Sequence, residues 1–488
     1  MNAANAAAFL ALLCLAAAST LSSISSISSR APHKLGDNFI WGAASAAYQI
    51  EGNTKGGGRG PSIWDKFFAD GKHSVDGATG DPGTDSYHRY AEDIALLKSY
   101  GANAYRFSIA WPRIVPRGGR NSPVNREGIA YYNRLINEVI KQGMTPFVTI
   151  YHWDAPQALE DKYGSWLSET IVDDFEHYAR ILFTEFGDRV KHWITLNEPL
   201  TISAEAYVVG IFAPGHTDLT ESYKVAKNQI MAHARTYHLY KTEFAAQKGV
   251  IGITLNGNWF EPAENTAHAR ENAQVMLDFQ WGLYADPIYK TGNYPKSMQE
   301  RNWEYLSWFT PQESEYILHT ADFMGMNAYT SSAVYGNVSS NPSTGYTYSS
   351  FNFMNGTMVG GESNEGWLWD APWGFEKLLV YLWETYHYPI YITENGFSVK
   401  DENKKPLNDL IQDWDRVNYH DGYLNAMLNA MQRGADIRSY FAWAITDNLE
   451  WASGYSSRFG ITHVDFDTLV RTPKMSSQFL QQWFKWHW

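Results

Sequence analysis

Two short segments rich in β-forming residues each lead to a glutamate, and the chain is broken at once after it. Segment 194–199 reads ITLNEP and segment 392–396 reads ITENG, so these glutamates are Glu198 and Glu394. A strand that ends on a carboxylate presents it at the strand's C-terminal end. Hydrolysis of a glycosidic bond needs two facing carboxyl groups, one to protonate the leaving oxygen and one to attack or to direct water. We therefore interpret Glu198 as the acid/base and Glu394 as the nucleophile of a glycoside hydrolase.

This interpretation depends on the elements that carry the two glutamates. Either motif alone is a weak signal, since a surface glutamate beside a turn is the commoner explanation. Eight short apolar runs are the candidate strands: residues 39–43, 104–108, 145–151, 192–197, 250–255, 323–327, 390–393 and 440–444. Their hydrophobicity is nearly continuous rather than alternating, which is typical of parallel strands covered on both faces.

Helical patterns lie between these runs, at residues 88–100, 132–139, 175–182, 375–386 and 422–433. Gly101, Gly143 and Gly187 follow the first three patterns, and glycine just past an apolar stripe is the expected C-terminal stop. Alternation of eight strands with helices predicts an α/β fold, a (β/α)8 TIM barrel. An open doubly wound sheet is the alternative, but no Gly-rich phosphate loop follows any of the runs.

A single domain over residues 31–488 is predicted, because neither a Pro/Ser-rich linker nor an internal repeat interrupts this part of the sequence. The connections after the fifth and sixth runs, 256–322 and 330–389, are among the longest in the chain. Long loops that follow barrel strands surround the active site at the C-terminal face of TIM barrels. Both glutamates are expected at that face.

Residues 1–30 carry the pattern of a secretory signal peptide with a short leader. Residues 6–18 form an uninterrupted apolar run that ends in three alanines, and a Ser/Thr-rich stretch follows it. Such a run is too short to span a bilayer but suits a signal peptide with a small-residue cleavage site, near residues 18–20. No Lys or Arg precedes the run, which departs from the usual pattern. We expect a secreted protein, with Asn337 and Asn355 as candidate N-glycosylation sites.

Composition excludes several classes of partner. The net charge of −13 argues against nucleic acid and anionic membrane as partners.

The one cysteine, Cys14, lies in the predicted signal, so the mature chain is expected to have no disulfide. The sequence contains no second long apolar run, so no membrane anchor is predicted. The histidines are scattered and predict no metal site. The 20 tryptophans fit either core packing or sugar stacking. We expect a monomer or a weak homo-oligomer.

Four motifs in order resemble glycoside hydrolase family 1, the β-glucosidase family, over nearly all of the chain from residue 39 onward. Segments 195–199 and 392–396 resemble the acid/base and nucleophile motifs. Segments 39–43 (FIWGA) and 48–52 (YQIEG) are similar to the N-terminal signature. Animal digestive members, insect ones especially, are the members that the chain resembles most. The resemblance implies a barrel enzyme that needs no cofactor.

The resemblance also implies which residues bind the sugar. Gln49 would bond the 3- and 4-hydroxyls, His152 and Trp153 would form the next pair, and Asn197 would donate to the 2-hydroxyl. Without the family, a histidine at a strand end is more often a satisfied core group than a ligand. Trp443 would supply the surface on which the sugar ring stacks.

The segment 447–451 (DNLEW) extends this set. Glu450 resembles the residue that holds the 4- and 6-hydroxyls, and Trp451 the residue that holds the 3-hydroxyl. Leu449 stands where phenylalanine is usual and Thr446 where an apolar residue is usual, which we expect to affect packing rather than chemistry.

Three residues resemble those beside the nucleophile. Arg106 would lie next to it, where a cation within about 4 Å lowers a carboxylate's pKa and keeps it ionised. Tyr329 would hydrogen-bond the same carboxylate, and Asn327 precedes it at the end of the same strand. On the aglycone side the resemblance implies Asn256 and Trp367, which lie on the long loops where residue identity varies most.

These assignments predict a retaining β-glucosidase that hydrolyses cellobiose, cello-oligosaccharides and related β-glucosides by double displacement. Plant thioglucosidases typically carry glutamine at the acid/base position, which Glu198 argues against. A 6-phosphate would be repelled by Glu450. A binding protein on the same fold would lack a catalytic glutamate, and both are present. Outside the family, the remaining alternative is a sugar-binding or structural barrel with surface glutamates.

Overall fold

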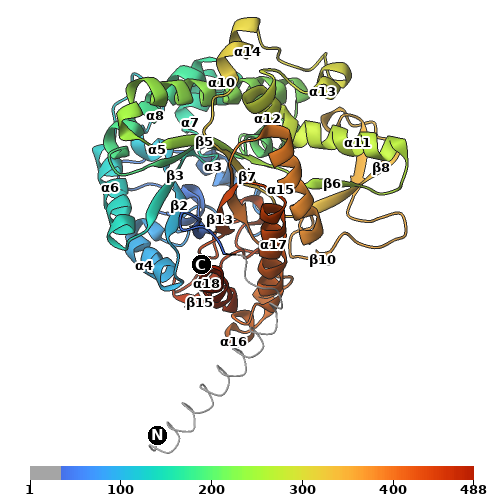
Figure 1. Ribbon diagram of the computed structural model, residues 1–488. Helices are drawn as coiled ribbons and strands as arrows, with labels where there is room; N and C mark the ends of the chain where they lie inside the picture. Colours follow the sequence, from blue (N-terminus) through green and yellow to red (C-terminus); the bar gives the residue numbers. More distant parts are fainter. Residues whose placement is uncertain (1–33) are drawn as a thin grey trace, which may run out of the picture.

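The computed structural model describes residues 34–488 and contains a closed barrel of eight parallel strands surrounded by helices (Figure 1). The strands are β1 (Ile40–Ala44), β2 (Ala104–Ser108), β3 (Thr145–Tyr151), β4 (His192–Asn197), β5 (Val250–Asn256), β7 (Met324–Asn327), β12 (Ile390–Asn395) and β13 (Ile437–Trp443). Each strand pairs with its neighbours in chain order, and β13 closes the barrel against β1. The predicted (β/α)8 fold is confirmed. The predicted signal peptide and leader, residues 1–30, lie outside the described residues.

Each of the eight predicted strands overlaps a barrel strand. The largest difference is at β13, which begins at Ile437 rather than at residue 440. Arg438, the second residue of this strand, is exposed and interrupts the apolar run. The apolar pattern in the sequence therefore begins later than the strand does. Near-continuous hydrophobicity therefore locates the strands because almost every strand residue is buried on one face or the other.

An outer ring of helices covers the barrel: α4 (Ser86–Ser99), α6 (Arg126–Lys141), α8 (Thr170–Phe186), α10 (Leu219–Glu243), α15 (Pro372–Tyr386), α17 (Trp414–Gln432) and α18 (Met475–His487). Gly101 and Gly143 follow the first two of these helices in the left-handed conformation that favours glycine, as expected. Gly187 is different, since its φ is −71°. A β-carbon there would lie 1.9 Å from the Gln247 side chain, so close packing explains this glycine.

The 25-residue helix α10 was not predicted, because polar side chains interrupt its buried face. Asn228, Gln229 and His233 are all buried on it. His233 bonds the hydroxyl of Thr195 on β4 at 2.7 Å, and Gln229 accepts a bond from Tyr284 at 2.8 Å. The bond of His233 therefore holds the helix to the strand that precedes Glu198, and the bond of Gln229 holds it to the segment that carries Tyr284.

Aromatic rings fill the barrel interior at the end where the strands begin. Phe147 on β3 is fully buried, and its ring centroid lies 5.2 Å from Phe441 on β13, 5.7 Å from Tyr391 on β12 and 6.0 Å from Phe323. Strand β3 pairs with neither β12 nor β13, so these rings meet across the inside of the barrel. The interior is a packed core, as in other TIM barrels.

The two long connections pack against one another beside the barrel. After β5 the chain forms β6 (Trp259–Pro262) and α11 (Ala267–Leu277), and after β7 it forms β8 (Ser331–Val338) and β9 (Thr347–Ser350). Strands β6, β8 and β9 make one small sheet, at the right of Figure 1 next to α11. The two connections that were predicted to be long therefore form the small sheet and α11 rather than irregular loops. Within residues 34–488, no helix is long and apolar enough to cross a membrane.

Candidate active site

Glu198 and Glu394 open onto one pocket of about 520 Å³ at the ends of β4 and β12. Glu394 lies within β12, whereas Glu198 directly follows β4 and precedes the short helix α9 (Pro199–Thr201). Eleven of the other pocket residues are His152, Trp153, Thr201, Glu205, Asn256, Gln280, Tyr329, Glu365, Trp367, Trp443 and Glu450. The sequence prediction that the two glutamates meet at the C-terminal face of a barrel is therefore in agreement with the geometry.

Glu394 is buried between a cation and a phenol. Arg106 Nη1 donates to Glu394 Oε1 at 2.5 Å, and the hydroxyl of Tyr329 donates to Oε2 at 2.7 Å. Both Arg106 and Glu394 side chains are nearly excluded from solvent, with 1% and 4% of their surface exposed. Burial and the charge of Glu394 raise the pKa of Tyr329, which therefore stays protonated as a donor. Each oxygen of Glu394 is held by a separate donor.

Asn197 lies between the two carboxylates and is oriented by its neighbours. Its Oδ1 accepts from Arg106 Nη2 at 2.6 Å and from Asn327 Nδ2 at 3.1 Å, which identifies this atom as the oxygen. Its Nδ2 lies 3.1 Å from His152 Nε2. Burial lowers the pKa of His152, so the neutral ring can accept this bond. One N–H of Asn197 remains for a ligand.

Glu198 is held by neutral donors. Asn327 Nδ2 donates to its Oε1 at 2.6 Å, and the hydroxyl of Thr201 donates to its Oε2 at 2.8 Å. Asn256 Nδ2 in turn donates to the Thr201 hydroxyl at 2.9 Å. Burial, followed by the charge of Glu394, raises the pKa of Glu198 to about 8. A carboxyl group with that pKa is protonated at neutral pH and can act as an acid.

Three buried polar atoms of the predicted sugar-binding residues have no hydrogen-bond partner within the described part of the protein: Gln49 Oε1, His152 Nδ1 and Glu450 Oε2. Both N–H groups of the Gln49 amide are used, by Asn448 Oδ1 at 3.0 Å and the carbonyl of Leu449 at 2.8 Å. Buried polar atoms are normally satisfied, so these three point to a hydroxyl-rich ligand.

Trp153 differs in part from the predicted role. Its indole Nε1 donates to the backbone carbonyl of Asn197 at 2.9 Å, so this N–H is not free for a sugar. The ring packs against Trp451, with centroids 4.5 Å apart, and lines the pocket. Trp443 is the last residue of β13 and lies 5.9 Å from the His152 ring in a stacked arrangement. The structure thus brings together all of the predicted residues around the pocket or directly behind it.

Three of these residues have a left-handed backbone. The φ angles are 73° at Trp153, 44° at Glu198 and 45° at Trp451. This conformation costs free energy for a residue other than glycine, and such residues cluster at functional sites. Trp153 and Glu198 come within two residues of the ends of β3 and β4, and all three residues line the pocket.

The two departures in segment 446–451 lie in the protein interior. Leu449 is fully buried, and the hydroxyl of Thr446 is buried without a partner in the described structure. Neither residue lines the pocket.

Asn256 and Trp367, which the resemblance implies for the aglycone side, both line the pocket. Trp367 is 45% exposed, and its ring meets that of Tyr329 edge to face at 5.7 Å. Asn256 Oδ1 is buried and has no partner among the described residues. The pocket entrance therefore combines an exposed ring with an unpaired amide oxygen.

Among the polar pocket residues that sequence reasoning missed are Thr201, Glu205, Gln280 and Glu365. Spacing could have identified Thr201, because the third residue after the start of a helix faces back to that start. The other three lie on the long connections or on the π-helical segments Ile202–Val209 and Asp278–Gly282, and no pattern in the sequence marks them. Among residues 34–488, no group of three or more His, Cys, Asp or Glu side chains is arranged to hold a metal ion.

Comparisons with known proteins agree with this geometry. The sequence model of glycosyl hydrolase family 1 matches residues 31–487. Beta-glucosidase 1B of Phanerodontia chrysosporium is 47% identical over 93% of this chain and 86% of its own, and beta-glucosidase 24 of Oryza sativa subsp. japonica is 44% identical over 91% and 92%. The crystal structure of the beta-glucosidase from Trichoderma harzianum superposes with a TM-score of 0.91, at 43% identity, over 94% of this chain and 99% of that chain.

These relatives are fungal and plant proteins, so the expected likeness to insect digestive enzymes is not supported. The family model covers all eight barrel strands. The chain belongs to glycosyl hydrolase family 1, a family of glycoside hydrolases.

Proposed function

We propose that the protein is a retaining β-glucosidase that removes terminal, non-reducing β-D-glucosyl residues from small β-glucosides. The observation that carries this proposal is the unequal environment of the two pocket carboxyl groups. Glu394 is bonded by the cation of Arg106. Glu198 is bonded by neutral groups only, and its pKa is raised to about 8. A pair with separated roles is what double displacement requires.

In the first step, a carboxylate oxygen of Glu394 attacks the anomeric carbon while Glu198 gives its proton to the glycosidic oxygen. The bond to the aglycone breaks and a glycosyl ester forms. The negative charge of Glu394 is then gone, which removes one cause of the raised pKa of Glu198. Glu198 can now accept a proton from water, which attacks the ester and releases the sugar with its original anomeric configuration.

The sugar would be held by the atoms that are otherwise unpaired. Gln49 Oε1 and Glu450 Oε2 are acceptors, and His152 Nδ1 is a donor when Nε2 accepts from Asn197. The free N–H of Asn197 would bond the 2-hydroxyl, a contact that strengthens in the transition state. Burial and the charges of Glu365 and Glu394 raise the pKa of Glu450. These acidic neighbours disfavour a phosphorylated or carboxylated sugar.

Cellobiose and cello-oligosaccharides are the substrates that we propose for the outer pocket. Asn256 Oδ1 needs a donor, and the hydroxyls of a second glucosyl unit would supply one. Trp367 offers an exposed face for the next ring. Hydrolysis of cellobiose and cello-oligosaccharides would give the enzyme a role in the breakdown of cellulose.

We also propose that the protein is secreted after removal of a signal peptide near residues 18–20. The apolar run and alanine-rich end of residues 6–18 motivate this. Asn337 and Asn355 are both exposed, as glycosylation requires.

Proton NMR of cellobiose hydrolysis tests the mechanism. Double displacement retains configuration at the anomeric carbon, so β-glucose should appear first and α-glucose only later, through mutarotation. Appearance of α-glucose first would mean inversion and would contradict the assignment of Glu394 as a covalent nucleophile.

Glu394→Gln distinguishes an enzyme from a sugar-binding barrel. The variant keeps the shape of the side chain but lacks the nucleophilic charge, so kcat should fall by about 10⁴-fold or more. Binding of cellobiose, measured by calorimetry, should be kept within about tenfold, which also shows that the variant is folded. Full hydrolytic activity in Glu394→Gln would refute the proposed role.

Thr201→Val tests the pKa of the acid. Glu198 must be protonated to act, so kcat/KM should decline as the pH rises through about 8. The Thr201 hydroxyl donates to the ionised form and lowers this pKa, so its removal should shift the alkaline limb of the profile to higher pH. Thr201→Ser keeps the hydroxyl and should leave the limb in place. A shift to lower pH in Thr201→Val would contradict this account.

Expression of the full-length chain in a eukaryotic secretory host tests the location. The protein should accumulate in the medium with a new N-terminus near residues 19–21, and a variant without residues 1–18 should stay inside the cells. N-terminal sequencing measures the cleavage directly. Retention of uncleaved protein in the cells would overturn the proposal.

A further inference from the structure

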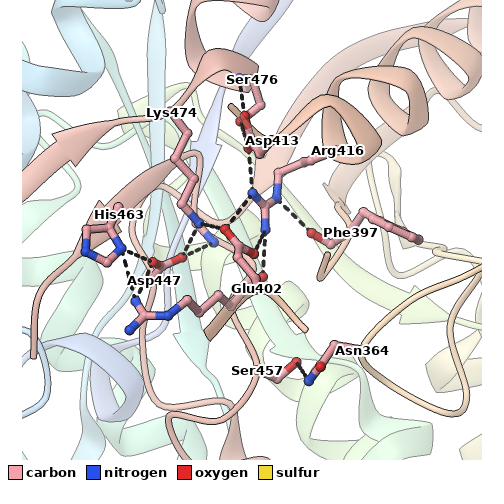
Figure 2. Close-up of polar contacts among 12 residues, drawn as sticks. Asn364, Phe397, Glu402, Asp413, Arg416, Asp447, Ser457, His463, Lys474 and Ser476 are labelled. Atoms are coloured by element: carbon pink, nitrogen blue, oxygen red, sulfur yellow. Dashed lines mark hydrogen bonds and ion pairs between the residues drawn. The ribbon is translucent and has the colours of Figure 1, made fainter. Parts of the chain in front are cut away.

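Figure 2 shows a buried network of charged side chains. None of its charged members lines the pocket. It consists of three carboxylates and three cations: Glu402, Asp413, Asp447, Arg416, Arg458 and Lys474. The formal charges cancel, and all six side chains are 11% exposed or less. We call these six residues the buried ion network.

Asp447 is the member of the network that lies three residues before Glu450 in the chain. Lys474 Nζ donates to its Oδ1 at 2.8 Å, and Arg458 Nη1 donates to its Oδ2 at 2.7 Å. The backbone N–H groups of Gly460 and Val464 donate to the same carboxylate at 3.0 and 3.3 Å. Although burial alone would raise it, Lys474 and Arg458 hold the pKa of Asp447 well below its usual range. This carboxylate is ionised and fixed from several directions.

The rest of the network anchors these groups to other elements. Lys474 also donates to Glu402 Oε1 at 2.6 Å, and Arg416 on α17 donates to Glu402 Oε2 at 2.6 Å. Arg416 further bonds Asp413, which accepts from the hydroxyl of Ser476 on α18 at 2.6 Å. The network therefore connects the segments that follow β12 and β13 with the first turn of the last helix, as Figure 2 shows.

Asp447 belongs to the loop that carries two of the sugar-binding residues. The 444–454 loop follows β13 and presents Glu450 and Trp451 to the pocket. On its inner side, Gln49 Nε2 bonds the carbonyl of Leu449. The network holds the other side, three residues before Glu450. No other charged group bonds the loop between Asp447 and Glu450 within residues 34–488.

A network of this kind is a poor source of net stability, because taking charges out of water costs about as much as their attraction returns. Its hydrogen bonds have strict directions, however, so it fixes the positions of the groups that it joins. Misplacement of a catalytic or binding group by about 1 Å can cost roughly 10²-fold in rate.

We propose that the buried ion network positions the 444–454 loop, so that Lys474 and Arg458 act through Asp447 to align Glu450 with the 4- and 6-hydroxyls of the bound sugar. This inference rests on the proposed β-glucosidase function. Lys474 and Arg458 are positioning residues and touch no substrate. They determine how well the enzyme distinguishes a glucosyl unit from a sugar unit that lacks the 4- or the 6-hydroxyl.

Comparison of two substrates with the same leaving group tests the proposal. The substrate 4-nitrophenyl β-D-glucoside carries the 6-hydroxyl, and the matching 4-nitrophenyl 6-deoxy-β-D-glucoside lacks it. In Lys474→Met, kcat/KM for the glucoside should fall by about 10²-fold, whereas the 6-deoxyglucoside should lose much less. The ratio of the two values should therefore drop by about tenfold, which a general loss of folded protein would not cause.

Lys241→Met is the matched control. Lys241 on α10 pairs with Asp322 at 2.6 Å, at the opposite end of the barrel, where the N–H of Ile251 near the start of β5 bonds the same carboxylate. The same substitution there should leave the substrate ratio unchanged. If the ratio is also unchanged in folded Lys474→Met, the inference is wrong.

A second variant covers the case in which Lys474→Met does not fold. Arg458 lies at the outer edge of the network, with 11% of its side chain exposed, so its loss is better tolerated. Arg458→Met should lower the substrate ratio, and Arg458→Lys, which keeps the charge, should restore part of it. An unchanged ratio in folded Arg458→Met would overturn the inference. Absence of glucosidase activity in the unmodified protein would instead refute the proposed function.

Discussion

The guanidinium of Arg106 is the group on which the arrangement of the site depends. It is fully buried inside the end of the barrel, where a cation without partners would be very costly. Its partners come from three strands besides its own: Thr149 on β3, Asn197 on β4, and Glu394 with the carbonyl of Thr393 on β12. A single planar donor group therefore sets the relative position of the strand ends from which both glutamates extend.

This arrangement also places the two carboxyl groups of one pocket in unequal surroundings. The charge of Glu394 is compensated by Arg106, and that charge then acts on Glu198, whose own donors are neutral. Loss of the charge in a glycosyl ester would change the acidity of Glu198 without any movement of the chain. The change from acid to base thus follows from fixed distances.

The sequence predicted the barrel well because the physical signal for each strand is local. Strand residues are buried on both faces, so apolar runs mark them, and the largest displacement of a strand boundary is at the exposed Arg438. Helix α10 was missed because its buried face contains amides and a histidine that find partners only in the folded protein. The same limit applied to the site. Glu198 and Glu394 stand in recognisable local segments, but Glu205, Gln280 and Glu365 reach the pocket through long connections whose course no periodicity sets.

The two ends of the barrel divide stability and function between them. The end where the strands begin is filled by aromatic rings around Phe147, which contribute burial without demanding strict direction. The other end holds buried charges and the left-handed residues Trp153, Glu198 and Trp451, each of which costs about 1–3 kcal/mol. Such costs persist only where surrounding structure fixes the backbone. Around the 444–454 loop this constraint is polar rather than apolar, because an apolar contact permits sliding, whereas the carboxylate of Asp447 has few allowed positions among its four donors.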